Sequence, residues 1–599
     1  MRYRSDGNIE FIGRKDAQVK IRGFRIELTE VEAVIRDFPG VTDATVAAFD
    51  HKSGQGKFIA AYVVGDEKLD IKAIKDFIGV RKPPYMIPAA IMQIDSIPLN
   101  QNQKVNRRAL PKPVVERGEI EAASSDTERI FCDIFRKVLS LDEVGATEDF
   151  FSLGGSSILV TLVLVEAEKA GFKMTYQDIF SHKTPRELAA MVDTGNKGST
   201  HSDVYDEVRE YDYGIIKPVL AANNLETFKA GGRTPLGDIM LTGATGYLGI
   251  HVLHELIENH EGRIYCLLRG KKAITARRRL KMLLVYYFSN AYEDLWDNRL
   301  FVVDGDITGE IPDTPVNTVI NCAAVVKHFS TGTEIEDVNT GGVKNLVDYC
   351  LKLGVRFIQV STMSTVSMFA DAGNHDERLI NIGEQDLYFG QPLELKYTRS
   401  KFLAERLILE AVALKGLDAK IMRVGNLAAR FSDGEFQVNF ETNSFMGRLR
   451  VYAMLGVCPF EQMDEPMEFS PIDEVAKAIL LLGETPEGCV LFHAYDHNTI
   501  RSASVFKGMG EMGLKISPVE KEAFEKAVKE AGEDPRKAKR LTSMLAYSSW
   551  DSDGFEIPWH NSYTMQVLYR MGYSWPDISE KYVKSFTGGM IGLGYFDLR

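Results

Sequence analysis

DIMLTGATGYLG, residues 238–249, joins an apolar strand to the start of a helix through three glycines. These glycines, Gly243, Gly246 and Gly249, are spaced G-x-x-G-x-x-G rather than G-x-G-x-x-G. A turn of this kind lets the backbone approach a pyrophosphate at the helix N-terminus and lets the helix pack closely on the sheet. The stretch therefore predicts a dinucleotide site. We expect the contacts at Thr242, Gly243, Thr245, Gly246, Tyr247, Leu248 and Gly249.

Four further apolar stretches follow the first at intervals, with amphipathic segments between them. They read RIYCLLRG (263–270), RLFVVDGDI (299–307), TVINCAA (318–324) and RFIQVST (356–362). Short apolar strands that alternate with helices predict a doubly wound parallel sheet of the α/β Rossmann type. After about Phe431 the alternation fades, so we expect an appended C-terminal subdomain over about 432–599, within a block that spans 212–599.

Side chains at the ends of these strands indicate which dinucleotide is bound. An acidic residue after the second strand would bond a ribose 2′-hydroxyl, but Arg269 stands there, and a guanidinium suits a 2′-phosphate. Arg279 is a candidate for a second contact, and a solvated basic helix face explains it equally well. The sequence therefore favours NADPH over NADH. Further cofactor contacts are expected at Asp306, Ile307, Ala323 and Ala324.

A tyrosine and a lysine four residues apart, Tyr397 and Lys401, lie on one face of a predicted helix. A nearby lysine charge lowers the pKa of a phenol, which can then give or take a proton beside a nicotinamide. A hydroxyl from the end of the fifth strand should complete this group. Thr362 is our candidate, and Ser361 and Ser364 are rivals because the register of the strand end is open.

Residues 124–195 show only helical patterns and lie between two polar linkers. Within them DFFSLGGSSI (149–158) delivers Ser156 to the start of an apolar helix. The serine is a simple N-cap, a nucleophile or the carrier of a phosphodiester. A nucleophile elbow needs a preceding strand and a base, which an all-helical block lacks. A phosphodiester would lie where free amides and the helix dipole favour negative charge.

Two blocks resemble parts of nonribosomal peptide synthetases. EDFFSLGGS (148–156) resembles the attachment motif of peptidyl carrier domains, four-helix bundles whose matching serine, here Ser156, holds a 4′-phosphopantetheine arm. DGNIEFIGRKDAQVKIRGFRIELTEVEAVI (6–35) and PLNQNQKVNRRALP (98–111) resemble the hinge and terminal loop of the adenylation C-terminal subdomain, a small α+β unit. We expect this subdomain over 1–113, and its hinge aspartate and lysine fall on Asp16 and Lys104. The core of an adenylation domain is missing, so we expect a fragment that does not activate a carboxylic acid by itself.

The third block resembles the extended short-chain dehydrogenase/reductase superfamily. Its place after a carrier block, with CLLRG (266–270), ARRRL (276–280) and MRVGNLAAR (422–430), resembles terminal thioester reductase domains. The resemblance implies reductive release: NADPH reduces the carrier-bound acyl or peptidyl thioester to an aldehyde or, with a second NADPH, to an alcohol. Thr362 and Tyr397 would stabilise the oxyanion and supply the proton, and Lys401 would position the ribose. The implied partners are a phosphopantetheinyl transferase and upstream synthetase domains.

Two other functions fit parts of the same pattern. An aminoadipate-type or carboxylic acid reductase shares this domain order and acts on a small acyl thioester. A reductase-like module could instead cyclise its product or dock without redox chemistry, but such domains lack the tyrosine that stands here at Tyr397. Consumption of NADPH by a loaded carrier separates these alternatives.

The composition excludes several other classes of protein. The 599 residues carry a net charge of −13, which argues against a nucleic-acid partner. No apolar run approaches the ~18 residues of a membrane span, and the N-terminus has no signal-peptide pattern. The six cysteines are far apart, so we expect a reducing cytoplasm, no disulfide framework and no zinc or other metal site.

Overall fold

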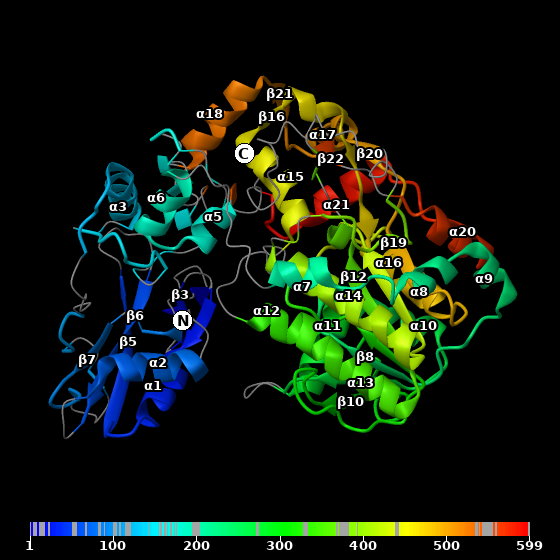
Figure 1. The fold of residues 1–599 in the computed structure, drawn as a ribbon, viewed down its shortest axis with the longest axis horizontal. Coiled ribbons are helices and arrows are strands. Elements are labelled where there is room, and N and C mark those ends of the chain that lie inside the picture. The colour runs from blue at the N-terminus through cyan, green and yellow to red at the C-terminus, as the bar shows by residue number, and fades with distance from the viewer. Residues whose placement is uncertain are drawn as a thin grey trace. The chain divides into compact units, whose positions relative to one another are not determined.

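A computed structural model of the chain divides into two compact units, Met1–His201 and Ser202–Arg599 (Figure 1). The structure describes residues 2–3, 9–10, 18–21, 24–50, 57–65, 69–81, 86–88, 90–99, 105–106, 109–113, 121–139, 141, 143–151, 153, 155, 159–160, 163–164, 166–167, 170–172, 174, 176–193, 204–270, 275–326, 333–366, 369–370, 382–391, 393, 395–437, 443–532, 537, 540–541, 555–556 and 560–596.

The second unit is built on a parallel sheet of seven strands. Their order across the sheet is β10-β9-β8-β11-β12-β14-β19, and every neighbouring pair is parallel. The strands are β8 (Ile239–Thr242), β9 (Ile264–Leu268), β10 (Leu300–Asp304), β11 (Thr318–Asn321), β12 (Arg356–Thr362), β14 (Ala419–Val424) and β19 (Leu491–Ala494). The predicted doubly wound sheet is confirmed, and all five predicted strands lie in it. The order reverses between β8 and β11, and open α/β sheets bind ligands beyond the carboxyl ends of such a switch point.

Helices cover both faces of this sheet (Figure 1). On one face, Ile239 and Leu241 of β8 share an apolar core with helices α10, α11 and α16. On the other face, Met240 shares a core with α13 and α14. Because successive side chains of β8 enter opposite layers, the strand is buried at every position, and only its last residue, Thr242, is polar. The helices are α10 (Tyr247–Asn259), α11 (Ala276–Phe288), α13 (Val343–Leu353), α14 (Lys396–Lys415) and α16 (Ile472–Gly483).

The region after Phe431 divides between the sheet and a second core. The fading alternation did not reveal that α16 and β19 return to the sheet, where β19 pairs with β14. The rest includes an apolar core with Phe436, Phe469 and Phe586. The elements of this region besides α16 and β19 are α15 (Ser444–Leu455), β16 (Val457–Pro459), β17 (Pro466–Met467), β18 (Ser470–Pro471), β20 (Ile500–Arg501), α17 (Ser502–Glu511), β21 (Ser517–Val519), α18 (Lys521–Gly532), β22 (Phe555–Glu556), α20 (Ser562–Arg570) and α21 (Glu580–Gly592).

Short elements complete the second unit. They are α7 (Val204–Glu210), α8 (Lys217–Ala222), α9 (Leu225–Ala230), α12 (Glu334–Glu336), a π-helix (Asp337–Gly342), β13 (Phe369–Ala370) and β15 (Leu427–Ala428). Among the residues described for the chain, no helix is both long enough and apolar enough to cross a membrane.

The first unit contains an α+β part and a helical part, which agrees with the prediction. In the α+β part, β6 pairs antiparallel with β5 and parallel with β7. Its elements are β1 (Arg2–Tyr3), β2 (Ile9–Glu10), β3 (Gln18–Ile21), β4 (Phe24–Glu27), α1 (Leu28–Arg36), β5 (Asp43–Asp50), β6 (Lys57–Val64), α2 (Ile71–Arg81) and β7 (Ala90–Gln93). The helical part has α3 (Asp126–Leu139), α5 (Tyr176–Ser181) and α6 (Pro185–Asp193), with further helical residues between 159 and 167.

Candidate functional site

The glycine loop after β8 brings three backbone segments together. Gly243 has a φ of +73°, and a Cβ there would lie 2.5 Å from the backbone nitrogen of Ala323. A Cβ on Gly249 would lie 2.1 Å from the carbonyl oxygen of Gly243. These two positions therefore need glycine for packing alone.

Gly246 has a different reason to be glycine. A Cβ there would meet only the Gly243 carbonyl, at 3.2 Å, and the residue is exposed. Gly246 is also the N-cap of α10, and no described side chain caps the first amides of this 13-residue helix. The missing side chain leaves an open cradle of backbone N–H groups, which fits a pyrophosphate.

Buried polar side chains fix the strand ends beneath this loop. The Thr242 hydroxyl donates to Asn321 Oδ1 at 2.5 Å, and the Asn321 amide donates to Gln359 Oε1 at 2.8 Å. Asn321 Oδ1 also accepts from the backbone N–H of Ala323 at 3.0 Å. These hydrogen bonds hold Ala323, and the adjoining Ala324, next to the glycine turn.

Two residues that we predicted as cofactor contacts direct their side chains elsewhere. The Tyr247 hydroxyl donates to the carbonyl of Ala428 at 3.0 Å, and its ring packs on Phe436. Leu248 is buried in the core. Tyr247 and Leu248 can therefore offer a cofactor only their backbone N–H groups. Thr245, in the same turn, is half-buried.

Arg269 and Arg279 lie together at the carboxyl ends of β9 and β10. The side chain of Arg269 is 73% exposed and lies 3.4 Å from a carboxylate oxygen of Asp306. Arg279 donates to the carbonyl of Arg269 at 3.2 Å, and its buried Nε finds no acceptor among the described residues. Burial and the neighbouring charge of Arg269 lower the pKa of Arg279. An anion such as a 2′-phosphate would satisfy both the unpartnered donor and the two charges, so these residues fit NADPH.

The loop after β10 contains Asp306, the residue that lies beside Arg269. Asp306 accepts from the backbone N–H of Thr308 at 3.0 Å. Ile307 is buried, and its carbonyl accepts from the Asn345 amide at 2.9 Å. A hollow of about 400 Å³ opens at Gly270, the residue after Arg269, and neither Arg269 nor Arg279 is among the residues that line it. Its lining residues are Gly270, Thr275, Ala276, Arg277, Asp297, Val302 and Asp304.

Tyr397 and Lys401 lie in the first two turns of α14, as their spacing predicted, and both are buried. Lys401 Nζ donates to the carbonyl of Val360 in β12 at 3.0 Å. Burial lowers the pKa of Lys401 to about 8, and nearby Glu405 and Cys322 oppose this shift. The ammonium keeps further donor positions beyond its bond to Val360.

The three hydroxyl candidates at the end of β12 fall on different sides of the chain. Ser361 is buried, and its hydroxyl donates to Glu405 at 2.5 Å. Thr362 and Ser364 are half-buried, and their hydroxyl oxygens lie 3.2 Å apart. Ser361 is therefore engaged away from Thr362, which leaves Thr362 and Ser364 as the hydroxyls of one pair.

Sequence reasoning missed Asn339, which lies in the π-helix. The Asn339 side chain accepts from the backbone N–H of Val325 at 2.8 Å and donates to the Val325 carbonyl at 3.1 Å. It also donates to the Ser400 hydroxyl at 3.1 Å, within the α14 turn that carries Tyr397. The asparagine thus joins the loop after β11 to α14. A π-turn often marks a functional position, and the following Gly341–Gly342 pair was a weak signal of it.

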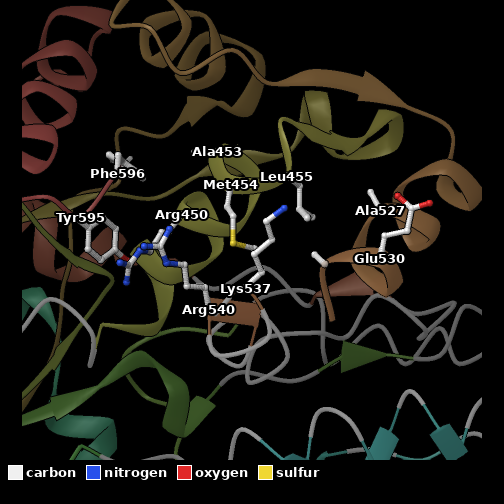
Figure 2. A pocket seen from close by; sticks show the side chains of 11 residues that line it. Arg450, Ala453, Met454, Leu455, Ala527, Glu530, Lys537, Arg540, Tyr595 and Phe596 are labelled. Atoms are coloured by element: carbon white, nitrogen blue, oxygen red, sulfur yellow. The ribbon is translucent and has the colours of Figure 1, made fainter. Parts of the chain in front are cut away.

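A separate pocket of about 480 Å³ opens in the C-terminal subdomain (Figure 2). Figure 2 shows Arg450 beside Tyr595 at one end and Glu530 at the other, and the Arg450 guanidinium lies 4.5 Å from the Tyr595 ring centre. The pocket is lined by Arg450, Ala453, Met454, Leu455, Ala527, Glu530, Ala531, Lys537, Arg540, Tyr595 and Phe596.

The carrier loop is described on both sides of Ser156, which itself lies outside the described residues, as do Asp16 and Lys104. Phe150 is fully buried and packs on Phe135, with 4.7 Å between ring centres. A Cβ on Gly155 would lie 2.3 Å from the Phe150 ring. The buried Phe150 side chain therefore anchors the loop, and the lack of a Cβ at Gly155 lets the backbone pass close to the Phe150 ring.

Fold and site together define a nicotinamide-dependent oxidoreductase of the Rossmann type that follows a carrier domain in the same chain. Three family models match separate parts of the chain. The model described as AMP-binding enzyme C-terminal domain matches 30–104, the phosphopantetheine attachment site matches 129–192, and the model described as Male sterility protein, an NAD-binding domain, matches 241–479.

Known proteins match long stretches of this chain. A solved thiolation-reductase di-domain from an archaeal nonribosomal peptide synthetase is 33% identical, with a TM-score of 0.71, and covers 80% of this chain and 100% of its own. A linear gramicidin synthase of Brevibacillus parabrevis is 28% identical over 97% of this chain, and an isonitrile lipopeptide synthase of Mycobacterium tuberculosis is 28% identical over 82%. This chain spans 12% and 21% of the lengths of these two synthetases. The chain belongs to the nonribosomal peptide synthetases, with an adenylation C-terminal subdomain, a phosphopantetheine-bearing carrier domain and a nicotinamide-dependent reductase domain.

Proposed function

We propose that this chain releases an acyl or peptidyl group from its own carrier by reduction. A phosphopantetheinyl transferase attaches the arm to Ser156, upstream synthetase domains load it, and the reductase converts the thioester to an aldehyde and the free thiol of the arm. The product is this aldehyde or, after a second reduction, the alcohol. The observation that carries this proposal is the bond from Lys401 Nζ to the carbonyl of Val360, which ties the helix that also bears Tyr397 to β12 two residues before Thr362.

The proposed cofactor is NADPH, which supplies the hydride. The open amides at Gly246 would hold its pyrophosphate, and Arg279 with Arg269 would hold its 2′-phosphate. Lys401 donates one bond among the described residues, and its other ammonium donors would serve ribose hydroxyls. Support for the phosphate specificity comes from the buried Arg279 Nε that has no acceptor among the described residues.

The proposed chemistry rests on two hydroxyls and one charge. The Tyr397 phenol and the Thr362 hydroxyl would donate to the thioester oxygen, where negative charge grows as the carbonyl is reduced. Tyr397 would then pass on its proton, and the Lys401 charge would favour the resulting phenolate. One hydride and one proton enter, the carbon–sulfur bond breaks, and sulfur leaves with its proton as a thiol.

The test uses the whole chain. The apo chain is loaded with a synthetic aminoacyl-pantetheine by a transferase, NADPH is added, and released products are identified by mass spectrometry. Loaded wild type should oxidise NADPH and release an aldehyde or alcohol, whereas Ser156→Ala should do neither.

Tyr397→Phe separates chemistry from binding. We expect turnover to fall by about 10²- to 10⁴-fold, because a proton donor is lost, while NADPH affinity stays within about twofold. Unchanged NADPH oxidation by this variant would overturn the assigned role. Failure of the loaded wild type to oxidise NADPH would overturn the proposed function itself.

A further inference from the structure

A fully buried ion pair lies beneath the active-site turn. Glu405 of α14 and Arg423 of β14 are both 0% exposed. The Arg423 Nη2 and Nε donate to one carboxylate oxygen of Glu405 at 2.8 and 3.1 Å. Removing two charges from water costs several kcal/mol per ion, and attraction rarely recovers more than this. Such a pair beside a reactive centre therefore suggests a purpose other than stability.

The other bonds of Arg423 are to neutral groups. Its Nη1 donates to the carbonyl of Asp386 at 2.9 Å and contacts His493 Nε2 at 3.2 Å. A guanidinium can only donate, so His493 Nε2 accepts, and His493 Nδ1–H donates to the carbonyl of His560 at 2.7 Å. Burial and Arg423 hold the pKa of His493 well below its usual value, so this histidine stays neutral. Glu405 is thus the carboxylate that balances Arg423 among the described residues.

The remaining bonds of Glu405 reach the turn that carries the hydroxyl pair. One carboxylate oxygen accepts from Ser361 at 2.5 Å and lies 3.3 Å from the Thr365 hydroxyl. Thr365 also lies 2.9 Å from the carbonyl of Thr362. Ser361 precedes Thr362, and Thr365 follows Ser364, so Glu405 holds both ends of this turn.

Glu405 also lies one helical turn after Lys401. The groups that face the Lys401 ammonium are Glu405, the Cys322 thiol and the carbonyl of Val360. Burial raises the pKa of Cys322 to about 12, so this thiol is neutral near pH 8. Glu405 is therefore the negative charge that counters the burial of Lys401.

We infer that Glu405, held in place by Arg423, is a positioning residue with two tasks: it fixes the turn that presents Thr362 and Ser364, and it keeps Lys401 protonated at neutral pH. This inference rests on the proposed function. The two tasks predict different effects of different substitutions.

The first task concerns placement and is tested by Ser361→Ala. This variant leaves the ion pair intact and removes one bond to the turn. We expect kcat to fall about fivefold, the effect of one hydrogen bond, with the pH profile unmoved. A kcat equal to that of wild type would overturn the placement role.

The second task concerns charge and is tested by Glu405→Gln. The readouts are kcat and the Kd of NADPH, measured by fluorescence from pH 6 to pH 9.5. In wild type both should worsen as pH rises through about 8, because Lys401 loses its proton. In Glu405→Gln both changes should occur about one pH unit lower, because a neighbouring charge shifts a pKa by at least this much. Glu410→Gln, the same change five residues along α14, should keep the wild-type profile.

Further outcomes keep the two proposals apart. If Glu405→Gln does not fold, Glu405→Asp replaces it: the charge remains, so the profile should stay near that of wild type while kcat falls. A Glu405→Asp variant whose pH profile moves to lower pH, although the negative charge is kept, would overturn the charge role. The NADPH titration needs no turnover, so it tests Glu405 even if the loaded wild type releases no product. A folded Glu405→Gln with the wild-type pH dependence of NADPH binding would overturn the inference.

Discussion

Arg279→Gln should change the choice of dinucleotide more than Arg269→Gln does. Arg279 is partly buried, is fixed by its bond to the Arg269 carbonyl, and has a buried Nε without an acceptor in the described part of the chain. A hydrogen bond from such a charged donor contributes about 1.5–3 kcal/mol, which corresponds to about 10- to 150-fold in affinity. The Arg269 side chain is 73% exposed and already near Asp306, so its contribution should stay below about 1 kcal/mol, or fivefold.

The assay is a fluorescence titration of the whole chain with NADPH and with NADH at fixed ionic strength. NADH lacks the 2′-phosphate, so the NADPH-to-NADH affinity ratio isolates the contact from general damage. Arg277→Gln is the matched control, because Arg277 lies on the same helix turn but pairs with Asp297 at 2.7 Å. We expect the ratio to collapse in Arg279→Gln, to fall slightly in Arg269→Gln and to stay unchanged in the control. A larger effect at Arg269, or an equal loss for both dinucleotides, would refute this reasoning.

Two further predictions concern backbone space and buried charge. Gly249→Ala would place a Cβ 2.1 Å from the Gly243 carbonyl oxygen, so the melting temperature of this variant should fall by several degrees. Gly246→Ala, whose Cβ would lie 3.2 Å from the same atom, should melt like wild type but bind NADPH at least about tenfold more weakly. Equal melting temperatures of the two variants would contradict this account. Burial raises the pKa of Asp496 to about 8 in the native state. In the unfolded chain this carboxyl loses its proton at about pH 4, so the native state loses stability as the pH rises from about 4 to 8. The free energy of unfolding of Asp496→Asn should therefore exceed that of wild type by about 1–4 kcal/mol at pH 8.5 and by little at pH 5, as measured by thermal unfolding. A difference that does not depend on pH would count against this prediction.

The sequence predicted five of the seven strands of the large sheet. The first five strands of the second unit are short apolar runs, and each lies where it was expected. β14 was not predicted, and neither was β19, which has only four residues and includes His493. Its apolar side chains are buried by contacts with α16 and β14, which no short periodicity can show. The boundary of the C-terminal subdomain was blurred for the same reason.

The candidate site was predictable where its parts are local. The glycine loop and the Tyr397–Lys401 spacing are each contained in one turn, so the residue pattern reports them directly. The choice among Ser361, Thr362 and Ser364 depends on the register of β12, and only the bond from Ser361 to Glu405 separates them. That bond spans 44 positions of the chain, and the bond between Asn339 and Ser400 spans 61.

Different forces hold the two halves of the site, and this affects how each tolerates change. The cofactor half is shaped by backbone: Gly243 and Gly249 leave no room for a Cβ, and the strand ends are tied by neutral amide and hydroxyl bonds. The chemical half depends on buried charge, because Lys401 and Glu405 share one helix within a low-dielectric layer. Electrostatic interactions are strongest where water is excluded. Substitutions in the first half should therefore act through steric fit and be largely independent of pH, whereas substitutions in the second should move the pH at which the enzyme works.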